Sequence, residues 1–508
     1  MAVKCEPPLS ICRIQWLDVQ GCIPIDVNKV LYKKRFERLV QALEHDQLDF
    51  EGVQKRLLNS LKPLDFGADI ISHTKKFTGR QWVFDAIDRW LREATPERVF
   101  WISGEPGIGK TAISAELTNR YSEIVAIHFC KFAHSQKSSP RHLVLSIIYQ
   151  LTTQLPEYEG LLATLDIEDL VLDDATTIFD NLLVQQLVKL SPPDREIVIL
   201  IDALDEATKD GRNELASFIS AEFLKTPSWL RLIITSRPEK AVTSPMTGLN
   251  PFILKSQTEA NNQDIRRYLM TELKSLLEGR TDAKEIIEHI VVRSEGIFLY
   301  VDSVAKALQT KSLSIDNLEE FPKGLGGVYW QFFERQFPNF ENFKKEIRPA
   351  LRIILAGREP LPIQILQDYF NWKEDELRDF IRSIGSLFTD IFGGGKEVIQ
   401  AYHKSLSDWL TTESMSGIYY VSKMEGDKTL ADLGWNEFKK NAKALSSYFV
   451  NQLPVHLLDL KQVDKIAELL LDFTWIQEKT DRGLVYELLQ DYKRAIDAFP
   501  AKHGKKSA

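Results

Sequence analysis

The sequence predicts an α/β protein in which a parallel β-sheet is followed by a mostly helical C-terminal half. Apolar, strand-like runs alternate with helical stretches from about residue 70 to 256, the pattern of a sheet covered by helices on both faces. After about residue 257 the strand pattern fades and helical spacing takes over. The predicted strands are 98–103, 125–132, 196–202, 230–236 and 251–255, and the predicted helices of this block lie near 81–93, 110–121, 140–153, 179–190 and 212–224.

The remaining elements follow from the spacing of apolar residues and from turn residues. Two helices are expected at 30–45 and 50–61, before Pro63 and Gly67 mark a boundary. Two short strands around the glycines at 393–395 predict a hairpin. Beyond the sheet, helices are predicted at 263–277, 283–293 and 296–308, followed by a compact helical block at 328–413 and another at 433–498.

The composition is that of a globular protein with several domains. At 508 residues, with 44% hydrophobic and 27% charged residues, the chain is too long for one core, and two to four domains are expected. A net charge of −8 provides no basic field, so nucleic acid is not an expected partner. We find no signal peptide, no apolar stretch of membrane-spanning length and no C-x-x-C pair, so we expect a reduced, cytoplasmic setting without a membrane. The four cysteines are Cys5, Cys12, Cys22 and Cys130.

A glycine-rich segment with the pattern G-x-x-x-x-G-K-T lies between the first predicted strand of the sheet and the next helix. Glycines let the backbone curl so that successive N–H groups point at phosphate oxygens, and the helix N-terminus adds its positive dipole end. We expect Lys110 to bridge the β- and γ-phosphates and the Thr111 hydroxyl to ligate Mg²⁺. The predicted phosphate-binding loop consists of Gly104, Glu105, Pro106, Gly107, Ile108, Gly109, Lys110 and Thr111.

Carboxylates follow the apolar strand at 196–202. Asp202 stands where this strand ends, and ligands bind at that edge of parallel sheets, so we expect Asp202 to hold Mg²⁺ together with Thr111. Asp205 and Glu206 come one turn later, and one of them is the candidate that polarises the attacking water. The alternative for these two residues is a solvated helix cap.

Arg237 follows the strand at 230–236, whose last residues carry hydroxyl groups. Arginine makes strong bidentate contacts to phosphate, so this side chain is a candidate to detect a γ-phosphate and to take part in catalysis. The alternative is a surface cation before a proline, since most exposed charges are only solvated.

The chain resembles the NACHT subgroup of the STAND signal-transduction ATPases in three segments, G-E-P-G-I-G-K-T, I-L-I-D-A-L-D-E and I-I-T-S-R-P. The D-A-L-D-E form distinguishes it from simple P-loop kinases and from most AAA+ motors. The resemblance, which extends to nephrocystin-like and apoptosome-like members, implies an α/β P-loop NTPase fold with a parallel sheet of the ASCE type. It also implies ATP or ADP with Mg²⁺ as cofactors, and a homo-oligomer in the activated state.

The resemblance assigns roles to further residues. His403 matches the histidine that the family places against the ADP β-phosphate at the end of a winged helix, and the alternative is a surface or core histidine. Residues 296–298 read Gly-Ile-Phe where related proteins carry Gly-x-Pro with the proline on the base, so base selectivity stays open. The family's x-G-R element, whose backbone cradles adenine, is matched by Phe77, Thr78, Gly79 and Arg80.

The order of domains in the family gives the expected division of this chain. It runs from an N-terminal helical and mixed segment, a candidate effector remnant, through nucleotide-binding, helical and winged-helix domains to a C-terminal helical domain. The last of these resembles the segment that precedes sensor repeats in apoptosome-like members. The chain is therefore expected to be a sensor-less member, a fragment, or a protein whose sensor is another chain. The expected ranges are 1–66, 70–256, 257–312, 320–413 and 430–500.

Three functions remain in competition. The first is an ATP-binding regulatory switch in signalling or defence, closed with ADP and oligomerising with ATP, with slow ATP hydrolysis and a sensor or effector protein as partner. The second is an AAA+-like motor or loader, which turns over steadily without a trigger. The third is a winged-helix transcription regulator, but the segment 373–382 before the predicted hairpin carries four acidic and three basic residues, a poor match for DNA phosphates.

Overall fold

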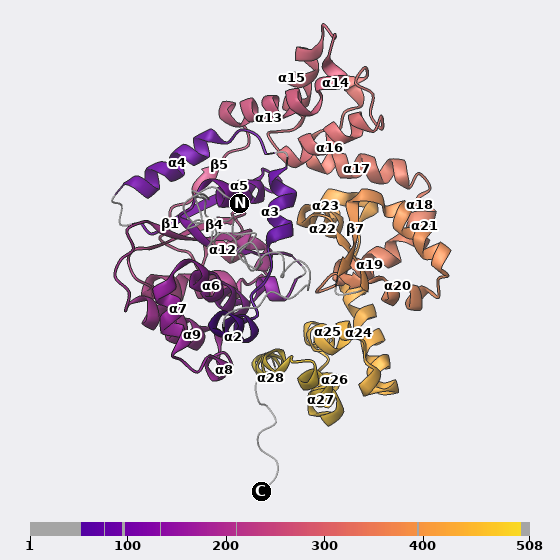
Figure 1. Cartoon of the computed structure of the whole chain (residues 1–508). Coiled ribbons are helices and arrows are strands. Elements are labelled where there is room, and N and C mark those ends of the chain that lie inside the picture. Colours follow the sequence, from indigo (N-terminus) through magenta and orange to yellow (C-terminus); the bar gives the residue numbers. More distant parts are fainter. Residues whose placement is uncertain are drawn as a thin grey trace, which may run out of the picture. The chain divides into compact units, whose positions relative to one another are not determined.

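The computed structural model describes residues 52–75, 77–93, 97–132, 134–209, 211–393 and 396–498. The chain divides into two compact units, and Figure 1 labels many of their helices and strands. The first unit extends to Gly324 except for residues 134 and 135, which belong with the second unit from Leu325 onward. The predicted helix at 30–45 and three of the cysteines, Cys5, Cys12 and Cys22, lie outside the described residues.

The first unit is built around a five-stranded parallel sheet with the strand order β2-β3-β4-β1-β5. All five predicted strands are confirmed; β4 has the predicted ends, and the ends of the other strands differ from the prediction by at most three residues. The strands are β1 (Val99–Gly104), β2 (Ile124–Phe129), β3 (Ile197–Asp202), β4 (Leu230–Ser236) and β5 (Phe252–Leu254).

The helices of the first unit agree with the predicted alternation and add short helices that the sequence did not reveal. A π-helical turn at Phe179–Val184 interrupts the helix predicted at 179–190. The helices are α2 (Gly52–Leu61), α3 (Gly67–Thr74), α4 (Gln81–Arg92), α5 (Lys110–Arg120), α6 (Pro140–Gln154), α7 (Pro156–Ala163), α8 (Ile167–Leu170), α9 (Ala175–Ile178), α10 (Gln185–Leu187), α11 (Glu214–Glu222), α12 (Lys240–Thr243), α13 (Glu259–Glu272), α14 (Lys274–Leu277), α15 (Ala283–Arg293) and α16 (Phe298–Gln309).

Helices cover both faces of the sheet, and strand β3 shows why its sequence is continuously apolar. Val198 and Leu200 belong to a buried cluster with residues of α3, α4 and α5, whereas Ile199 and Ile201 belong to a second cluster with residues of α2, α6 and α11. Successive side chains of a strand point to opposite faces, so a sheet that is covered on both sides needs apolar residues at every position. The polar residue that ends this run, Asp202, is the last residue of β3 and stands at the carboxyl end of the strand.

The second unit contains helices and a small antiparallel sheet in the order β6-β8-β7. The predicted hairpin is confirmed by β7 and β8, whereas β6 was not predicted; the assignment of this region as a winged helix remains a prediction. The main elements are α17 (Gly324–Gln336), α19 (Arg348–Ala356), β6 (Leu361–Pro362), α20 (Ile363–Phe370), α21 (Glu374–Ile384), β7 (Phe388–Gly393), β8 (Lys396–Ala401), α22 (Lys404–Thr411), α24 (Lys423–Lys440), α25 (Ser447–Asp459), α26 (Val463–Leu471), α27 (Phe473–Asp481) and α28 (Val485–Ala498).

A buried polar chain joins α24 to α25 in this unit. The His456 ring lies between the Asp427 carboxylate, 3.0 Å from Nδ1, and the Tyr448 hydroxyl, 3.0 Å from Nε2. The Arg358 guanidinium donates to the same carboxylate at 3.1 Å. Asp427, Tyr448 and His456 are all buried, with at most 7% of each residue exposed. Burial lowers the pKa of His456, and Asp427 only partly opposes this, while Arg358 and Lys423 add to it.

We expect the stability of the protein to fall on mild acidification because of His456. Below about pH 6.5 the unfolded chain binds a proton that the buried ring resists, so the free energy of unfolding decreases as the pH falls. Thermal unfolding of the full chain at pH 7.5 and pH 5.5 measures this loss. In the His456→Gln variant the difference between the two pH values should shrink, and an unchanged difference would remove His456 as the cause.

No helix within the described ranges is long and apolar enough to cross a membrane.

Candidate functional site

The loop between β1 and α5 has the conformation that its glycines predict. Gly107 and Gly109 have φ angles of 74° and 101°, which are left-handed values that favour glycine. Gly109 is the N-cap of α5, so the first backbone N–H groups of this helix have no partner within it. The strand, loop and helix thus form a site at which an anion is stabilised by backbone donors and by the helix dipole.

Lys110 folds back over this loop. Its ammonium group donates hydrogen bonds to the carbonyl oxygens of Gly104 at 2.8 Å and Glu105 at 3.0 Å. The side chain is buried, and burial lowers the pKa of Lys110 to about 8, an effect that Asp205 opposes and Arg237 reinforces. The cation therefore lies at the loop, and its predicted contact with the β- and γ-phosphates remains a prediction.

Asp202 lies at the carboxyl end of β3 with one satisfied and one unsatisfied oxygen. Oδ1 accepts hydrogen bonds from the hydroxyls of Ser114 and Thr235, both at 2.6 Å. Oδ2 is buried and has no hydrogen-bond partner among the described residues. Burial raises the pKa of Asp202, and the hydroxyls of Ser114, Thr235 and Thr111 partly offset this.

A divalent cation fits this carboxylate. An unpaired, buried carboxylate oxygen is costly unless a cation or a bound water completes its contacts. The Thr111 hydroxyl acts on the same carboxylate, so the two residues predicted to hold Mg²⁺ lie together. Carboxylate and hydroxyl oxygens are ligands that Mg²⁺ prefers.

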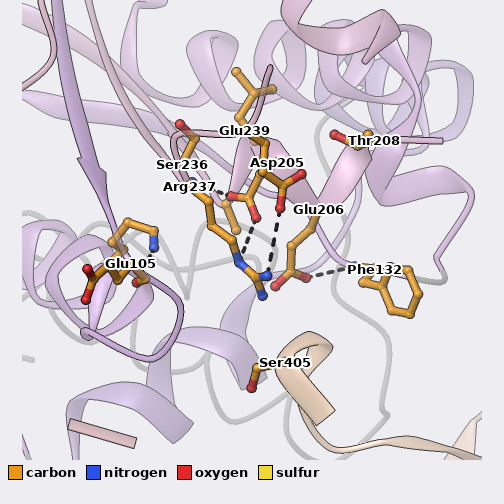
Figure 2. A network of polar contacts seen from close by, with 12 residues as sticks. Glu105, Phe132, Asp205, Glu206, Thr208, Ser236, Arg237, Glu239 and Ser405 are labelled. Carbon is orange, nitrogen blue, oxygen red and sulfur yellow. Dashed lines mark hydrogen bonds and ion pairs between the residues drawn. The ribbon is translucent and has the colours of Figure 1, made fainter. Parts of the chain in front are cut away.

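Asp205 and Arg237 form a buried pair at the same edge of the sheet (Figure 2). The carboxylate accepts the backbone N–H of Arg237 at 2.9 Å and lies 3.2 Å from its Nε. The side chains of Asp205 and Arg237 come from neighbouring strand ends, because β3 pairs with β4. Glu239 lies 3.8 Å from the other end of the guanidinium. Neither the carboxylate nor the arginine is a solvated surface charge, since they are 1% and 7% exposed.

Glu206 differs from Asp205 in its surroundings. It is half-buried, and its Oε2 accepts the backbone N–H of Phe132 at 2.8 Å, as Figure 2 shows. The short 3₁₀ helix Leu204–Ala207 carries both carboxylates, and Ala203 before it has a left-handed φ of 52°. The sharp turn at Ala203 thus gives Asp205 and Glu206 different surroundings, although they are adjacent in the sequence.

The predicted adenine cradle lies at the start of α4. Gly79 has a φ of 79°, and a Cβ on it would lie 2.2 Å from Oδ1 of Asp264. Arg80 caps α4, and its guanidinium donates to the carbonyl oxygen of Ile108 in the phosphate-binding loop. The ring of Phe77 packs 5.9 Å from that of Phe84, and Thr78 is half-buried. Their contact with a base remains a prediction.

His403 belongs to the second unit. It is the N-cap of α22, and its Nδ1 accepts the backbone N–H of Ser405 at 3.1 Å. The capping role explains why a histidine suits this position, and the predicted contact with ADP remains a prediction.

Sequence reasoning missed several residues that hold the site in place. Ser114 lies four positions after Lys110, on the same face of α5, so helical spacing was an available signal. Asn261 and Asp264 contact Arg80 from α13, and no local pattern points to them.

The parallel sheet, the glycine loop with its lysine after β1, and the buried carboxylate at the end of β3, which β4 separates from β1, together define a P-loop NTPase. A model of the protein family described as Nephrocystin 3, N-terminal, matches residues 78–237. The vegetative incompatibility protein HET-E-1 of Podospora anserina is 20% identical over 355 residues, which are 65% of this chain and 26% of that protein. These matches agree with the motifs and support a NACHT-type P-loop NTPase.

Solved structures resemble the chain only distantly. The Walker-type ATPase PABY2304 of Pyrococcus abyssi has a TM-score of 0.34 at 10% identity and covers 66% of this chain and 96% of its own. Cdc6p from Pyrobaculum aerophilum has a TM-score of 0.31 at 12% identity and covers 70% of this chain and 97% of its own. At these scores the similarity carries no conclusion about this chain. The chain spans about a quarter of the length of HET-E-1, so the activity of that whole protein is not transferred to it.

Proposed function

We propose that the protein is an ATP-binding regulatory switch of the STAND class, closed with ADP and oligomerising with ATP, that acts in signalling or defence. The observation that carries the proposal is the buried Asp205–Arg237 pair beside the phosphate-binding loop. Arginine is the side chain best suited to a terminal phosphate, and here it already has a carboxylate partner. A γ-phosphate would compete with Asp205 for the guanidinium of Arg237. The side chain of Arg237 therefore has two alternative partners, Asp205 when ADP is bound and the γ-phosphate when ATP is bound.

The remaining residues have roles that follow from their positions. Lys110 and the N-terminus of α5 bind the phosphate chain. Thr111 and Asp202 hold Mg²⁺, which neutralises charge on the phosphates when bound. Glu206, the more accessible carboxylate, orients the attacking water and accepts its proton in a slow hydrolysis step.

The nucleotide found in freshly purified protein tests the switch directly. Denaturing the protein and identifying the released nucleotide should give bound ADP, and adding ATP with Mg²⁺ should convert the protein to a larger assembly, measured by its mass in solution. A motor would instead turn over ATP steadily, without trapped ADP. Fast turnover with no change in mass would reject the switch.

Asp202→Asn should weaken nucleotide binding only when Mg²⁺ is present. The amide can still accept from Ser114 and Thr235, but it removes the negative charge that the metal requires. Contacts to charged groups are worth about 1.5–3 kcal/mol, so affinity should fall on the order of 10- to 100-fold. Titration of ADP with and without Mg²⁺ measures this, with Asp85→Asn on exposed α4 surface as control. An equal loss in the absence of metal would contradict the role.

His403→Ala should release ADP faster if the histidine contacts the bound nucleotide. A contact made only in the ADP state shifts the equilibrium by its own free energy, on the order of 1–3 kcal/mol, or roughly a five- to 150-fold change. Displacement of a fluorescent ADP analogue measures the rate. His403→Asn retains a capping side chain, so a normal rate in that variant would show that only the cap matters.

A further inference from the structure

Arg80 connects the phosphate-binding loop to the helices that follow the sheet. Its guanidinium donates one hydrogen bond to the carbonyl oxygen of Ile108 and another, at 2.6 Å, to Oδ1 of Asn261 on α13. The side chain is 2% exposed, and its backbone has a left-handed φ of 65°. Such a conformation costs a non-glycine residue free energy and persists only where the surroundings fix it.

The surroundings of Arg80 do fix it. Oδ2 of Asp264 accepts the backbone N–H of Arg80 at 3.0 Å and the ring N–H of Trp82 at 3.0 Å. The ring of Phe298 lies 4.5 Å from the guanidinium carbon, within the range of a cation–π contact. Burial lowers the pKa of Arg80 to about 10, and Asp264 opposes this, so the group keeps its charge at neutral pH.

Asn261 is held as firmly as the arginine that it contacts. Its amide nitrogen donates to the carbonyl oxygens of Ser256 at 2.6 Å and Gly296 at 2.9 Å. Its Oδ1 is thereby oriented toward Arg80. Hydrogen bonds therefore connect the loop to Arg80, Arg80 to Asn261 on α13, and Asn261 to Gly296 in the turn before α16.

A second contact reaches the loop from α16. The backbone N–H of Leu299 donates to the carbonyl oxygen of Gly107 at 3.0 Å. Leu299 is in the first turn of the helix, where this N–H has no partner within the helix. A Cβ on Gly107 would lie 2.9 Å from the Cβ of Leu299, so the close approach requires glycine.

We propose that Arg80 is a positioning residue through which α13–α16 orient the phosphate-binding N–H groups of the loop. A trans peptide is planar, and its C=O and N–H point in opposite directions. Holding the carbonyl of Ile108 therefore fixes the direction of the N–H of Gly109, the N-cap residue of α5 in the phosphate-binding loop. This inference rests on the proposed nucleotide binding. It adds that the contacts of α13–α16 with the loop determine the affinity for the nucleotide.

Thermodynamic linkage makes the coupling measurable from both sides. If attachment of α13–α16 favours the loop that binds phosphate, then phosphate binding must strengthen the attachment by the same factor. A ligand with no base, such as pyrophosphate with Mg²⁺, should therefore slow hydrogen exchange of the amides at 297–301. A contact that depends on the base would respond to ADP only.

Arg80→Lys tests the proposal, because lysine keeps the charge but cannot bridge Ile108 and Asn261 in one plane. We expect the affinity for both pyrophosphate and ADP to fall on the order of tenfold, and the ligand-induced protection at 297–301 to disappear. Arg92→Lys, the same exchange at an arginine of α4 that is 82% exposed, should change neither. Unchanged affinity and protection in Arg80→Lys, while Lys110→Ala loses binding, would overturn the inference and leave the proposed function intact.

Asn261→Ala provides a second test, because it leaves Arg80 in place and removes only its partner on α13. Because the two residues act through one chain of contacts, their effects on affinity should be strongly non-additive in the double variant. Fully additive losses would show that Arg80 acts without Asn261 and would reject the coupling. If neither ligand binds the wild-type protein under any condition, the proposed function itself fails.

Discussion

Replacing Lys110 by alanine is expected to abolish nucleotide binding. Its ammonium group lies at the loop, held by the carbonyls of Gly104 and Glu105, and is the charge placed to pair with the β- and γ-phosphates. Loss of two charge-assisted contacts of about 1.5–3 kcal/mol each corresponds to an affinity loss of at least about 100-fold. Equilibrium titration with ATP and ADP measures it.

The fold should survive this substitution, because alanine is a strong helix former at the start of α5. Thermal unfolding without nucleotide should therefore remain cooperative. Lys189→Ala, at an exposed lysine of the same unit, is the matched control and should bind as the wild type does. Wild-type affinity in Lys110→Ala would place the nucleotide somewhere other than this loop.

Glu206→Gln is expected to slow ATP hydrolysis by about 10²- to 10⁴-fold while leaving nucleotide binding nearly unchanged. A glutamine keeps the size of the side chain and its capacity to accept from Phe132, but it cannot take a proton from water. Glu206 is half-buried, whereas Asp205 is 1% exposed and engaged by Arg237 through backbone and side chain. The geometry therefore favours Glu206 as the base.

Asp205→Asn is the natural comparison for this prediction. It should weaken the anchor of Arg237 and so reduce discrimination between ATP and ADP, in addition to any effect on the rate. Single-turnover hydrolysis and titration with both nucleotides separate these effects for the two variants. If Glu206→Gln hydrolyses ATP at the wild-type rate and Asp205→Asn is inactive, the role of base passes to Asp205.

The sheet could be predicted from the sequence because its strands are buried on both faces and are therefore continuously apolar. Elements without such a pattern were missed. The two residues of β6, Leu361–Pro362, are too few to show a period. The sequence predicts a boundary at Gly67, but this residue begins α3. Helix α7 begins at Pro156, a residue that is accepted in the first turn of a helix.

The site divides in the same way between local and distant information. The loop residues and Asp202 stand in short, continuous sequence motifs, so their roles could be predicted from local sequence. The pairing of Asp205 with Arg237 was not predicted, although both residues were named, because it depends on β3 lying beside β4. The contact from Arg80 to Asn261 spans 181 positions, and no spacing rule reaches so far.

The hydrogen bonds of Asp202 also affect when, during synthesis, the protein becomes able to bind nucleotide. Its partners Ser114 and Thr235 are 88 positions before it and 33 positions after it, on two other elements. A nascent chain that has not yet emerged from the ribosome beyond Thr235 has a complete phosphate-binding loop but an incompletely held carboxylate. At about 5–20 residues per second, translation reaches the partners of the loop on α13 and α16 only seconds later. We therefore expect nucleotide to bind only after the whole first unit has been synthesised and folded. Contacts between residues so distant in sequence should also make this unit slow to fold.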